Sequence, residues 1–141
     1  MNRTQILSAK QIQQKLNRIA WQIFESNYQE SIIIIAGISG NGFVIAQRLA
    51  SIIKEISDID VLLTEIKINK NEPFNSPIEL NIEEKDYNGK VVILADDVIN
   101  SGKTMIYGVK HFLKVPVKKI NTTALIDRKH LRFPIRTDYA G

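Results

Sequence analysis

Two adjacent carboxylates, Asp96 and Asp97, end an apolar run and stand just before the small polar segment Asn100 to Thr104. Small residues that open a helix can bind phosphate, because the first backbone amides point outwards and Ser and Thr hydroxyls add donors. Carboxylates beside a phosphate need other partners, and both ribose hydroxyls and Mg²⁺ suit them. The residues from Asp96 to Thr104 therefore predict a ribose-phosphate site.

The two parts of this segment are expected to have different tasks. Asp96 and Asp97 are the candidate catalytic residues and metal ligands, since they would hold the ribose and Mg²⁺. The candidate substrate-binding residues are Val98, Ile99, Asn100, Ser101, Gly102, Lys103 and Thr104, and those from Asn100 to Thr104 would hold the phosphate. A surface turn with a helix-capping carboxylate would explain one acidic residue. It does not explain an acidic pair followed by Ser-Gly-Lys-Thr after a buried strand.

Two other phosphate-binding motifs fit this chain less well. Gly102-Lys103-Thr104 resembles the end of a nucleoside-triphosphate loop, but that motif requires glycine where Asp97 stands. Gly40-Asn41-Gly42 begins like a dinucleotide fingerprint, but Ile45 occupies the place of its third glycine. Both an ATPase and a dinucleotide-dependent dehydrogenase are therefore disfavoured.

A scaffold of parallel strands would place these residues at one edge of a sheet. The run from Ser31 to Ala36 is continuously apolar and β-branched, which is typical of a strand buried on both faces. We expect strands at residues 31–36, 61–68, 90–95 and 120–126, and helices from 8 to about 25, 43–56 and 103–114. This alternation predicts one α/β domain, residues 1–141, with a mainly parallel central sheet flanked by helices. Ligands of such sheets bind outside the carboxyl ends of the strands.

Local signals refine this picture. Ser8 and Gln11 fit a capping box at the start of the first helix, and Trp21 in that helix is expected in the core. In the second helix Val44 is counted with the buried apolar positions. Residues 69–88 are rich in Asn, Pro, Glu and Lys, which predicts a mobile lid loop or a short hairpin.

Composition narrows the possible classes. A chain of 141 residues allows one core, and its apolar runs are too short to span a membrane. The absence of cysteine and the presence of only two histidines exclude a thiolate site and disfavour a histidine-based metal site. The net charge of +4 suits an anionic small molecule or RNA, but the basic residues are scattered, as on an ordinary solvated surface. We expect a cytoplasmic protein.

The order of buried strand, acidic pair and Ser-Gly-Lys-Thr loop resembles the phosphoribosyl pyrophosphate motif of type I phosphoribosyltransferases. Within that superfamily the whole chain is most similar to the bifunctional pyrimidine operon attenuator/uracil phosphoribosyltransferase family. The segments that carry this likeness are Ile6 to Ala20, Gly37 to Ala50, Leu125 to His130 and Pro134 to Tyr139.

The resemblance implies transfer of ribose 5-phosphate from phosphoribosyl pyrophosphate to a nucleobase, with uracil as first choice, and Mg²⁺ as cofactor. Ser39, Gly40, Asn41 and Gly42 would form the pyrophosphate loop. Asp127 would approach the metal-bound pyrophosphate, with Arg128 beside it. The resemblance also implies a small hood built by the termini, a homodimer or larger homo-oligomer, and binding of nucleoside monophosphates.

The chain departs from the family at identifiable places. Related purine enzymes carry an acidic base where Asn100 stands, which favours a pyrimidine substrate. The attenuator family has basic side chains at the positions of Ser39 and Asn41, and a Tyr-Arg-Asp signature near Asn69-Lys70-Asn71, so weaker pyrophosphate binding is expected. The family also continues past Gly141 towards the base pocket, so we expect either that this chain is short or that its base pocket is incomplete. These departures keep open a non-catalytic regulator that senses phosphoribosyl pyrophosphate or nucleotides and binds RNA.

Overall fold

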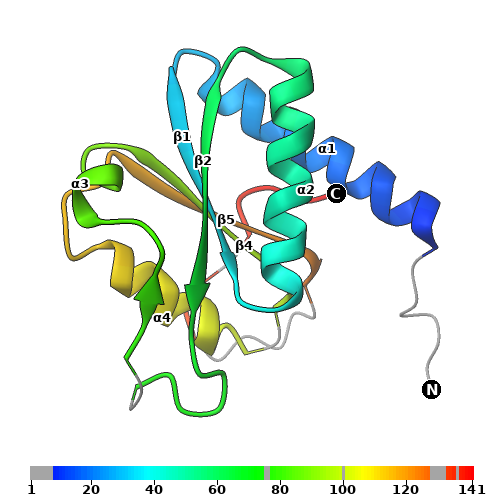
Figure 1. The fold of residues 1–141 in the computed structure, drawn as a ribbon. Coiled ribbons are helices and arrows are strands. Elements are labelled where there is room, and N and C mark those ends of the chain that lie inside the picture. Colours follow the sequence, from blue (N-terminus) through cyan, green and yellow to red (C-terminus); the bar gives the residue numbers. More distant parts are fainter. Residues whose placement is uncertain (1–7, 75–76, 100, 128–132, 136) are drawn as a thin grey trace.

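A five-stranded sheet runs through the middle of the protein (Figure 1). The computed structural model describes residues 8–74, 77–99, 101–127, 133–135 and 137–141. The strands are β1 (Ile32–Ile38), β2 (Asp60–Lys67), β3 (Glu79–Leu80), β4 (Val91–Ile99) and β5 (Lys119–Asp127), and their order is β3-β2-β1-β4-β5. Neighbouring strands among β1, β2, β4 and β5 pair in parallel, and β3 joins β2 antiparallel. The predicted mainly parallel α/β sheet is confirmed.

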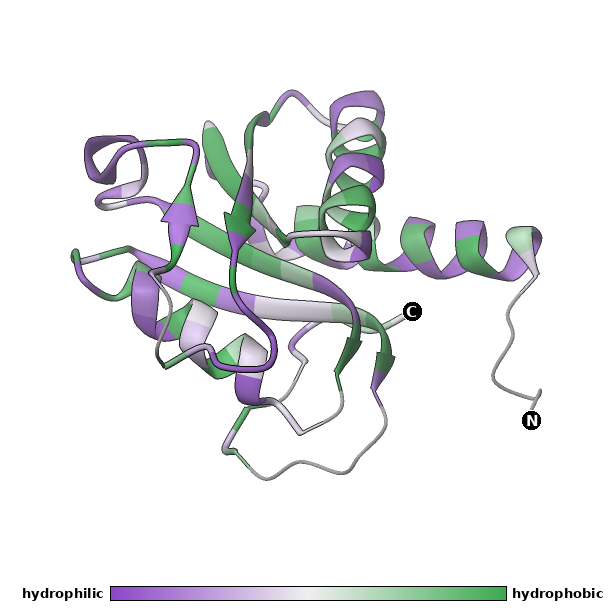
Figure 2. Ribbon diagram, turned by 60° about the horizontal axis from the view of Figure 1, so that its bottom comes forward, coloured by the Kyte–Doolittle hydropathy of each residue, from purple (hydrophilic) through white to green (hydrophobic). Residues whose placement is uncertain are grey.

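Helices cover both faces of this sheet. They are α1 (Ala9–Asn27), α2 (Asn41–Ile56), α3 (Glu84–Tyr87) and α4 (Lys103–Phe112). The helices α1 and α2 pack on one face of the sheet, and α3 and α4 pack on the other. Each face of the sheet has its own apolar cluster. Figure 2 shows apolar strands between helices whose outer sides are polar. Because β1 and β4 are apolar at almost every position, both of their faces can be buried, as the sequence predicted.

The C-terminal residues lie against the N-terminal helix α1. The side chain of Gln22 on α1 makes two hydrogen bonds with the backbone of Ala140, at 2.5 and 3.0 Å. Tyr139 is buried, pairs with Thr123 on β5 in a parallel bridge, and its hydroxyl donates to Asn121 at 3.1 Å. The C-terminal residues therefore extend the edge of the sheet next to β5 and fasten α1 to it.

The connection from residue 69 to 88 is more structured than a single lid. Glu79 and Leu80 pair with the end of β2, which agrees with the expected short hairpin. The short helix α3 was not expected, and it places Tyr87 in the core, with its ring 5.1 Å from that of Phe112 on α4. Only the part of this segment before β3 is therefore a candidate for a movable cover.

Two expectations about core residues were wrong. Trp21 is 49% exposed and stacks edge-on against Phe24, because its neighbour Ala20 occupies the buried position on α1. Val44 is 48% exposed, because the face of α2 that meets the sheet passes through Ile45 and Leu49 instead. The capping box of Ser8 and Gln11, by contrast, is confirmed.

Gly37 lets α2 lie directly on β1. A Cβ atom there would stand 2.5 Å from Phe43 Cα and 2.6 Å from the Gly42 carbonyl oxygen, and backbone atoms cannot move aside cheaply. We expect Gly37→Ala to lower the free energy of unfolding by about 3 kcal/mol, measured by urea denaturation. The matched change Gly108→Ala meets side-chain ends and no backbone, with Leu94 Cδ2 at 2.8 Å and Ile68 Cδ1 at 3.5 Å, and should cost less than about 1 kcal/mol. Equal losses in the two variants would contradict this account.

Candidate functional site

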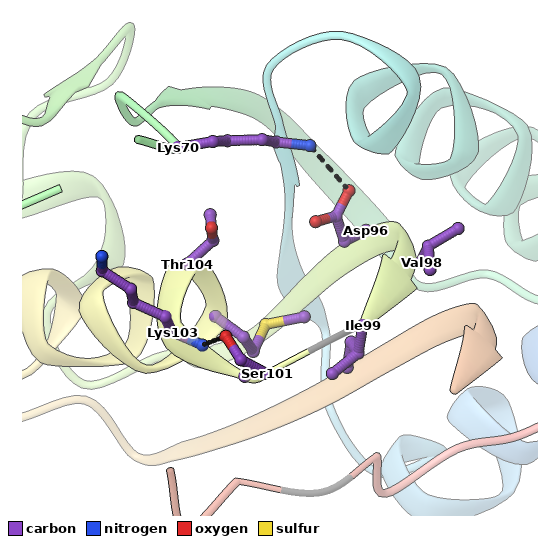
Figure 3. A pocket seen from close by; sticks show the side chains of 9 residues that line it. Lys70, Asp96, Val98, Ile99, Ser101, Lys103 and Thr104 are labelled. Carbon is purple, nitrogen blue, oxygen red and sulfur yellow. Dashed lines mark hydrogen bonds and ion pairs between the residues drawn. The ribbon is translucent and has the colours of Figure 1, made fainter. Parts of the chain in front are cut away.

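A pocket of about 220 Å³ lies beside the carboxyl end of β4, where α4 begins. Its lining residues are Lys70, Asp96, Val98, Ile99, Ser101, Gly102, Lys103, Thr104 and Met105. Figure 3 shows that these residues come from the end of β4, the first turn of α4 and the segment after β2. The volume is below the ~300–1,000 Å³ usual for a complete small-molecule site, so it suits one part of a ligand, such as a sugar phosphate.

The first turn of α4 forms one wall of the pocket. Gly102 precedes the helix with a φ of 86°, a left-handed conformation that glycine adopts without strain. The Ser101 hydroxyl accepts a hydrogen bond from the Lys103 amide at 3.2 Å, so Ser101 shapes the turn. The amides of Thr104 and Met105 belong to the first turn, where a helix offers its amides no partner of its own, and both residues line the same pocket. This wall has the donors that a phosphate needs.

The two carboxylates of the acidic pair lie in different surroundings. Asp96 is 4% exposed and lines the pocket, and its Oδ1 accepts the Asp97 amide at 2.8 Å. Asp97 is half-buried, and its carboxylate accepts the Val98 amide at 2.9 Å and the side-chain amide of Asn41 at 3.2 Å. Asp97 is therefore fixed by neighbours on β4 and α2, whereas Asp96 faces the space where a ligand would bind.

These surroundings move the two pKa values apart. Burial, followed by hydrogen bonding with the Asp97 side chain, raises the pKa of Asp96 to about 7, although the Asp97 amide and Lys70 act in the opposite direction. Burial also raises the pKa of Asp97, but hydrogen bonds with Asp96, Asn41 and the Val98 amide together outweigh it and leave that pKa below its ordinary value. When the pair carries a single negative charge, that charge therefore lies mainly on Asp97.

Gly42 brings the start of α2 up to the acidic pair. A Cβ atom at this position would lie 2.8 Å from Asp96 Oδ1 and 3.1 Å from the Ala95 carbonyl oxygen. The absence of a side chain therefore lets the loop before α2 approach the end of β4 and puts Asn41 within reach of Asp97. The backbone amide of Ser39 donates to the Ile66 carbonyl oxygen at 2.9 Å, so this amide is already occupied.

The predicted metal ligands do not form one group of three. Among the described residues there is no cluster of three His, Cys, Asp or Glu side chains placed to hold a metal. Asp127 pairs with Ile99, whereas Asp96 pairs with Ala124, so Asp127 lies three residues further along the sheet, roughly 10 Å. The acidic pair still fits Mg²⁺, which often binds one or two carboxylates and completes its shell with substrate phosphates and water. A cationic group, the Lys70 ammonium, already lies 3.8 Å from Asp96 Oδ1.

Most of the predicted site residues that the structure describes line the pocket or lie next to it. The predicted residues that line it are Asp96, Val98, Ile99, Ser101, Gly102, Lys103 and Thr104, and Asn41, Gly42 and Asp97 lie next to it. Asn100 and Arg128 lie outside the described residues. Lys70 and Met105 were missed as lining residues. Lys70 lies near the position of the family's Tyr-Arg-Asp signature, which could have pointed to it. Its position in the sequence alone, however, does not show that its side chain reaches the pocket.

The fold and the pocket together define an α/β protein with a candidate phosphate site at the carboxyl edge of a parallel sheet. The family model for the phosphoribosyl transferase domain matches residues 2–140. The chain belongs to the type I phosphoribosyltransferase family.

Known relatives support the same assignment. The bifunctional protein PyrR of Enterococcus faecalis is 34% identical, with 100% of this chain and 83% of the relative covered. The bifunctional protein PyrR of Clostridium acetobutylicum is 36% identical, with 99% and 82% covered. A crystal structure of a hypoxanthine-guanine phosphoribosyltransferase from Bacillus anthracis superposes with a TM-score of 0.77 and 26% identity, covering 95% of this chain and 77% of that one. No helix in the described part of the chain is long and apolar enough to cross a membrane.

Proposed function

We propose that this protein is a Mg²⁺-dependent phosphoribosyltransferase that moves ribose 5-phosphate from phosphoribosyl pyrophosphate to a nucleobase, with uracil as first candidate, and releases pyrophosphate. The observation that carries the proposal is the shared pocket of Asp96 and the first turn of α4. A buried carboxylate and a phosphate-binding helix start on one cavity match the two ends of a ribose 5-phosphate. Uracil rests on the similarity to the PyrR proteins, since the solved relative is named for purine bases.

Each residue of the pocket has a task in this reaction. The turn from Ser101 to Thr104 would bind the 5′-phosphate through amides and the Thr104 hydroxyl. Asp96 and Asp97 would accept the ribose hydroxyls, and Asp96 with the ligand's own phosphates would hold Mg²⁺. Bound Mg²⁺ supplies positive charge that offsets the charge of the leaving pyrophosphate. A base held next to ribose C1 can then displace pyrophosphate without a covalent intermediate on the protein.

A pyrophosphate-release assay tests this proposal. The protein is mixed with phosphoribosyl pyrophosphate, MgCl₂ and, one at a time, uracil, hypoxanthine, guanine and xanthine. We expect release with uracil and loss of release after chelation by EDTA. Release of pyrophosphate with a purine but not with uracil would support the proposed reaction and overturn the assignment of the base. Binding of phosphoribosyl pyrophosphate without release for any base would overturn the enzyme proposal.

A second candidate is a regulator that binds phosphoribosyl pyrophosphate or a nucleotide and responds through RNA. One contact favours it: Asn41, in the loop from Ser39 to Gly42, donates its side-chain amide to Asp97 at 3.2 Å, so this group already has a partner within the protein. The curated relatives are also named bifunctional. Titration of an RNA ligand at several salt concentrations, with and without nucleotide, would test this function. Homodimer formation and a cytoplasmic location remain further predictions.

A further inference from the structure

A second cavity, of about 370 Å³, lies beside α4 and shares no lining residue with the pocket of Asp96. One of its walls consists of Tyr107, Lys110, His111 and Lys114. Their spacing along α4 and the turn after it places the four side chains on one stripe of the helix. A helical stripe that only packs against a covering segment is apolar, whereas this one carries a phenol and three basic groups. The stripe therefore suits a ligand that is both anionic and aromatic.

The other wall of this cavity comes from the segment between β2 and β3. It consists of Phe74 and Ile78 together with Pro73 and Pro77. Phe74 is 61% exposed, so most of an apolar ring stays in water unless another group covers it. Among the described residues that line this cavity none is acidic. Its volume lies within the ~300–1,000 Å³ usual for a small-molecule site.

Each aromatic ring of the cavity has an ammonium group next to it. The Lys110 ammonium lies 5.7 Å from the centre of the Tyr107 ring. The Lys103 ammonium, which belongs to the first turn of α4, lies 5.7 Å from the centre of the Phe74 ring. Rings beside cationic groups bind nucleotides well, because the base stacks on the ring while the cation meets the phosphate.

His111 reports the electrostatic potential inside this cavity. Burial and then the charge of Lys114 lower the pKa of the imidazole, although Glu84 on α3 acts in the opposite direction. The neutral form of His111 therefore predominates at pH 7 and can donate one hydrogen bond. An anion bound beside Lys114 would favour the imidazolium and raise the pKa of His111.

We propose that this cavity is a second ligand site, which binds a nucleoside monophosphate separately from the ribose-phosphate pocket. The base lies against Phe74 and Tyr107, and the phosphate is bound by Lys110 and Lys114. The proposal goes beyond the transferase function and does not depend on it, because the two cavities have no lining residue in common.

Calorimetry with the first pocket occupied tests the second site. The protein is saturated with phosphoribosyl pyrophosphate and MgCl₂, without a base, and is then titrated with adenosine monophosphate or uridine monophosphate. We expect at least one of these nucleotides to bind at one equivalent per chain. Its two parts, the nucleoside without phosphate and ribose 5-phosphate without base, should each bind about tenfold more weakly or worse, because each meets only half of the site.

Substitutions of exposed residues locate the bound nucleotide. The double variant Lys110→Gln/Lys114→Gln should weaken nucleotide binding about tenfold or more, and Phe74→Ser should weaken it about fivefold. Both should change the affinity for phosphoribosyl pyrophosphate less than about twofold. The matched control is Lys10→Gln/Lys54→Gln, which removes the same charge from exposed positions of α1 and α2 on the other face of the sheet. This control should bind the nucleotide as the unchanged protein does.

A histidine titration by NMR gives a readout that does not depend on affinity. Addition of the nucleotide should raise the pKa of His111 in the unchanged protein and leave it unmoved in the Lys110→Gln/Lys114→Gln variant. An unmoved pKa of His111 in the unchanged protein, with the nucleotide bound, would place the nucleotide elsewhere and overturn the proposal.

The remaining outcomes separate this inference from the proposed function. If neither nucleotide binds once phosphoribosyl pyrophosphate is bound, or if the double lysine variant keeps full affinity, the second site is overturned. If a short single-stranded RNA binds here and neither mononucleotide does, the assigned ligand is wrong. If the unchanged protein does not bind phosphoribosyl pyrophosphate, the proposed function fails, whereas loss of nucleotide affinity in the double lysine variant would still support the second site.

Discussion

Asp97→Asn is expected to weaken binding of phosphoribosyl pyrophosphate about 100-fold in the presence of Mg²⁺. The hydrogen bonds that hold Asp97 keep its pKa below the ordinary value, so the residue is ionised at neutral pH and the substitution removes a full charge. Two charge-assisted hydrogen bonds to ribose hydroxyls would each contribute about 1.5 kcal/mol, and every 1.4 kcal/mol is a factor of ten in affinity. Calorimetric titration of both proteins measures the difference.

The control for this experiment removes the same charge at a distance. Asp60 is exposed and begins β2, at the end of the sheet opposite the pocket. Asp60→Asn should bind phosphoribosyl pyrophosphate as the unchanged protein does. If Asp97→Asn keeps its affinity while its thermal unfolding is also unchanged, Asp97 has no part in ribose binding, and the acidic pair must be assigned to Asp96 alone.

The sheet could be predicted from the sequence because its signals are local. The unbroken β-branched run from Ile32 to Ile35 is typical of a strand that is covered on both faces, and β1 is such a strand. The turn from Ser101 to Thr104 could also be placed at a helix start from the sequence, because its residues are neighbours in the chain; its role in phosphate binding stays a prediction.

The contacts across the site could not be predicted in the same way. Lys70 meets Asp96, and Asn41 meets Asp97, only after β1, β2 and β4 have paired in a definite order. The position of Asp127 depends on register: a shift of three residues along β5 separates it from the acidic pair, and the sequence contains no local signal for that shift. Periodicity predicts which face of a strand is buried, whereas register is decided by the packing of the whole sheet.

The failures in the helices have a related cause. Trp21 and Val44 are apolar, but each lies beside the buried stripe of its helix, and one residue corresponds to a rotation of about 100°. Helix α3 has four residues, too few for a periodic pattern, and it is fixed by the burial of Tyr87 against Phe112. The exposure of Trp21 and Val44 and the formation of α3 thus depend on tertiary contacts, which the local sequence does not reveal.

Asp96 connects the chemistry of the site with the stability of the fold. A carboxyl group that is 4% exposed is costly to ionise, and its pKa near 7 reflects this burial. An ordinary surface position would have avoided that cost. If Asp96 has the proposed role, its burial serves ligand binding, because a dry carboxylate binds ribose hydroxyls or a metal more strongly than a hydrated one does. Function and stability then oppose each other at this residue.

The substitution Asp96→Asn should therefore stabilise the protein at pH 8 while abolishing tight ligand binding. An acid whose pKa rises on folding, here from 3.8 to about 7, binds more protons in the folded state between these values. The stability of the unchanged protein then falls as the pH rises from about 4 to about 7 and stays reduced above that. Asparagine carries no charge, so the difference between the two proteins should grow by about 3 kcal/mol between pH 4.5 and pH 8.

Urea denaturation at several pH values, without divalent cations, measures this difference. Lys70 loses its partner in the variant, but its half-exposed ammonium can be hydrated, so the loss should be small. Asp60→Asn, which changes an exposed carboxylate, should show no such dependence on pH. A stability difference that is the same at pH 4.5 and pH 8 would mean that Asp96 is ionised without cost. In that case burial would not strengthen the binding of a ligand to Asp96, and any affinity of this carboxylate would come from its position in the pocket.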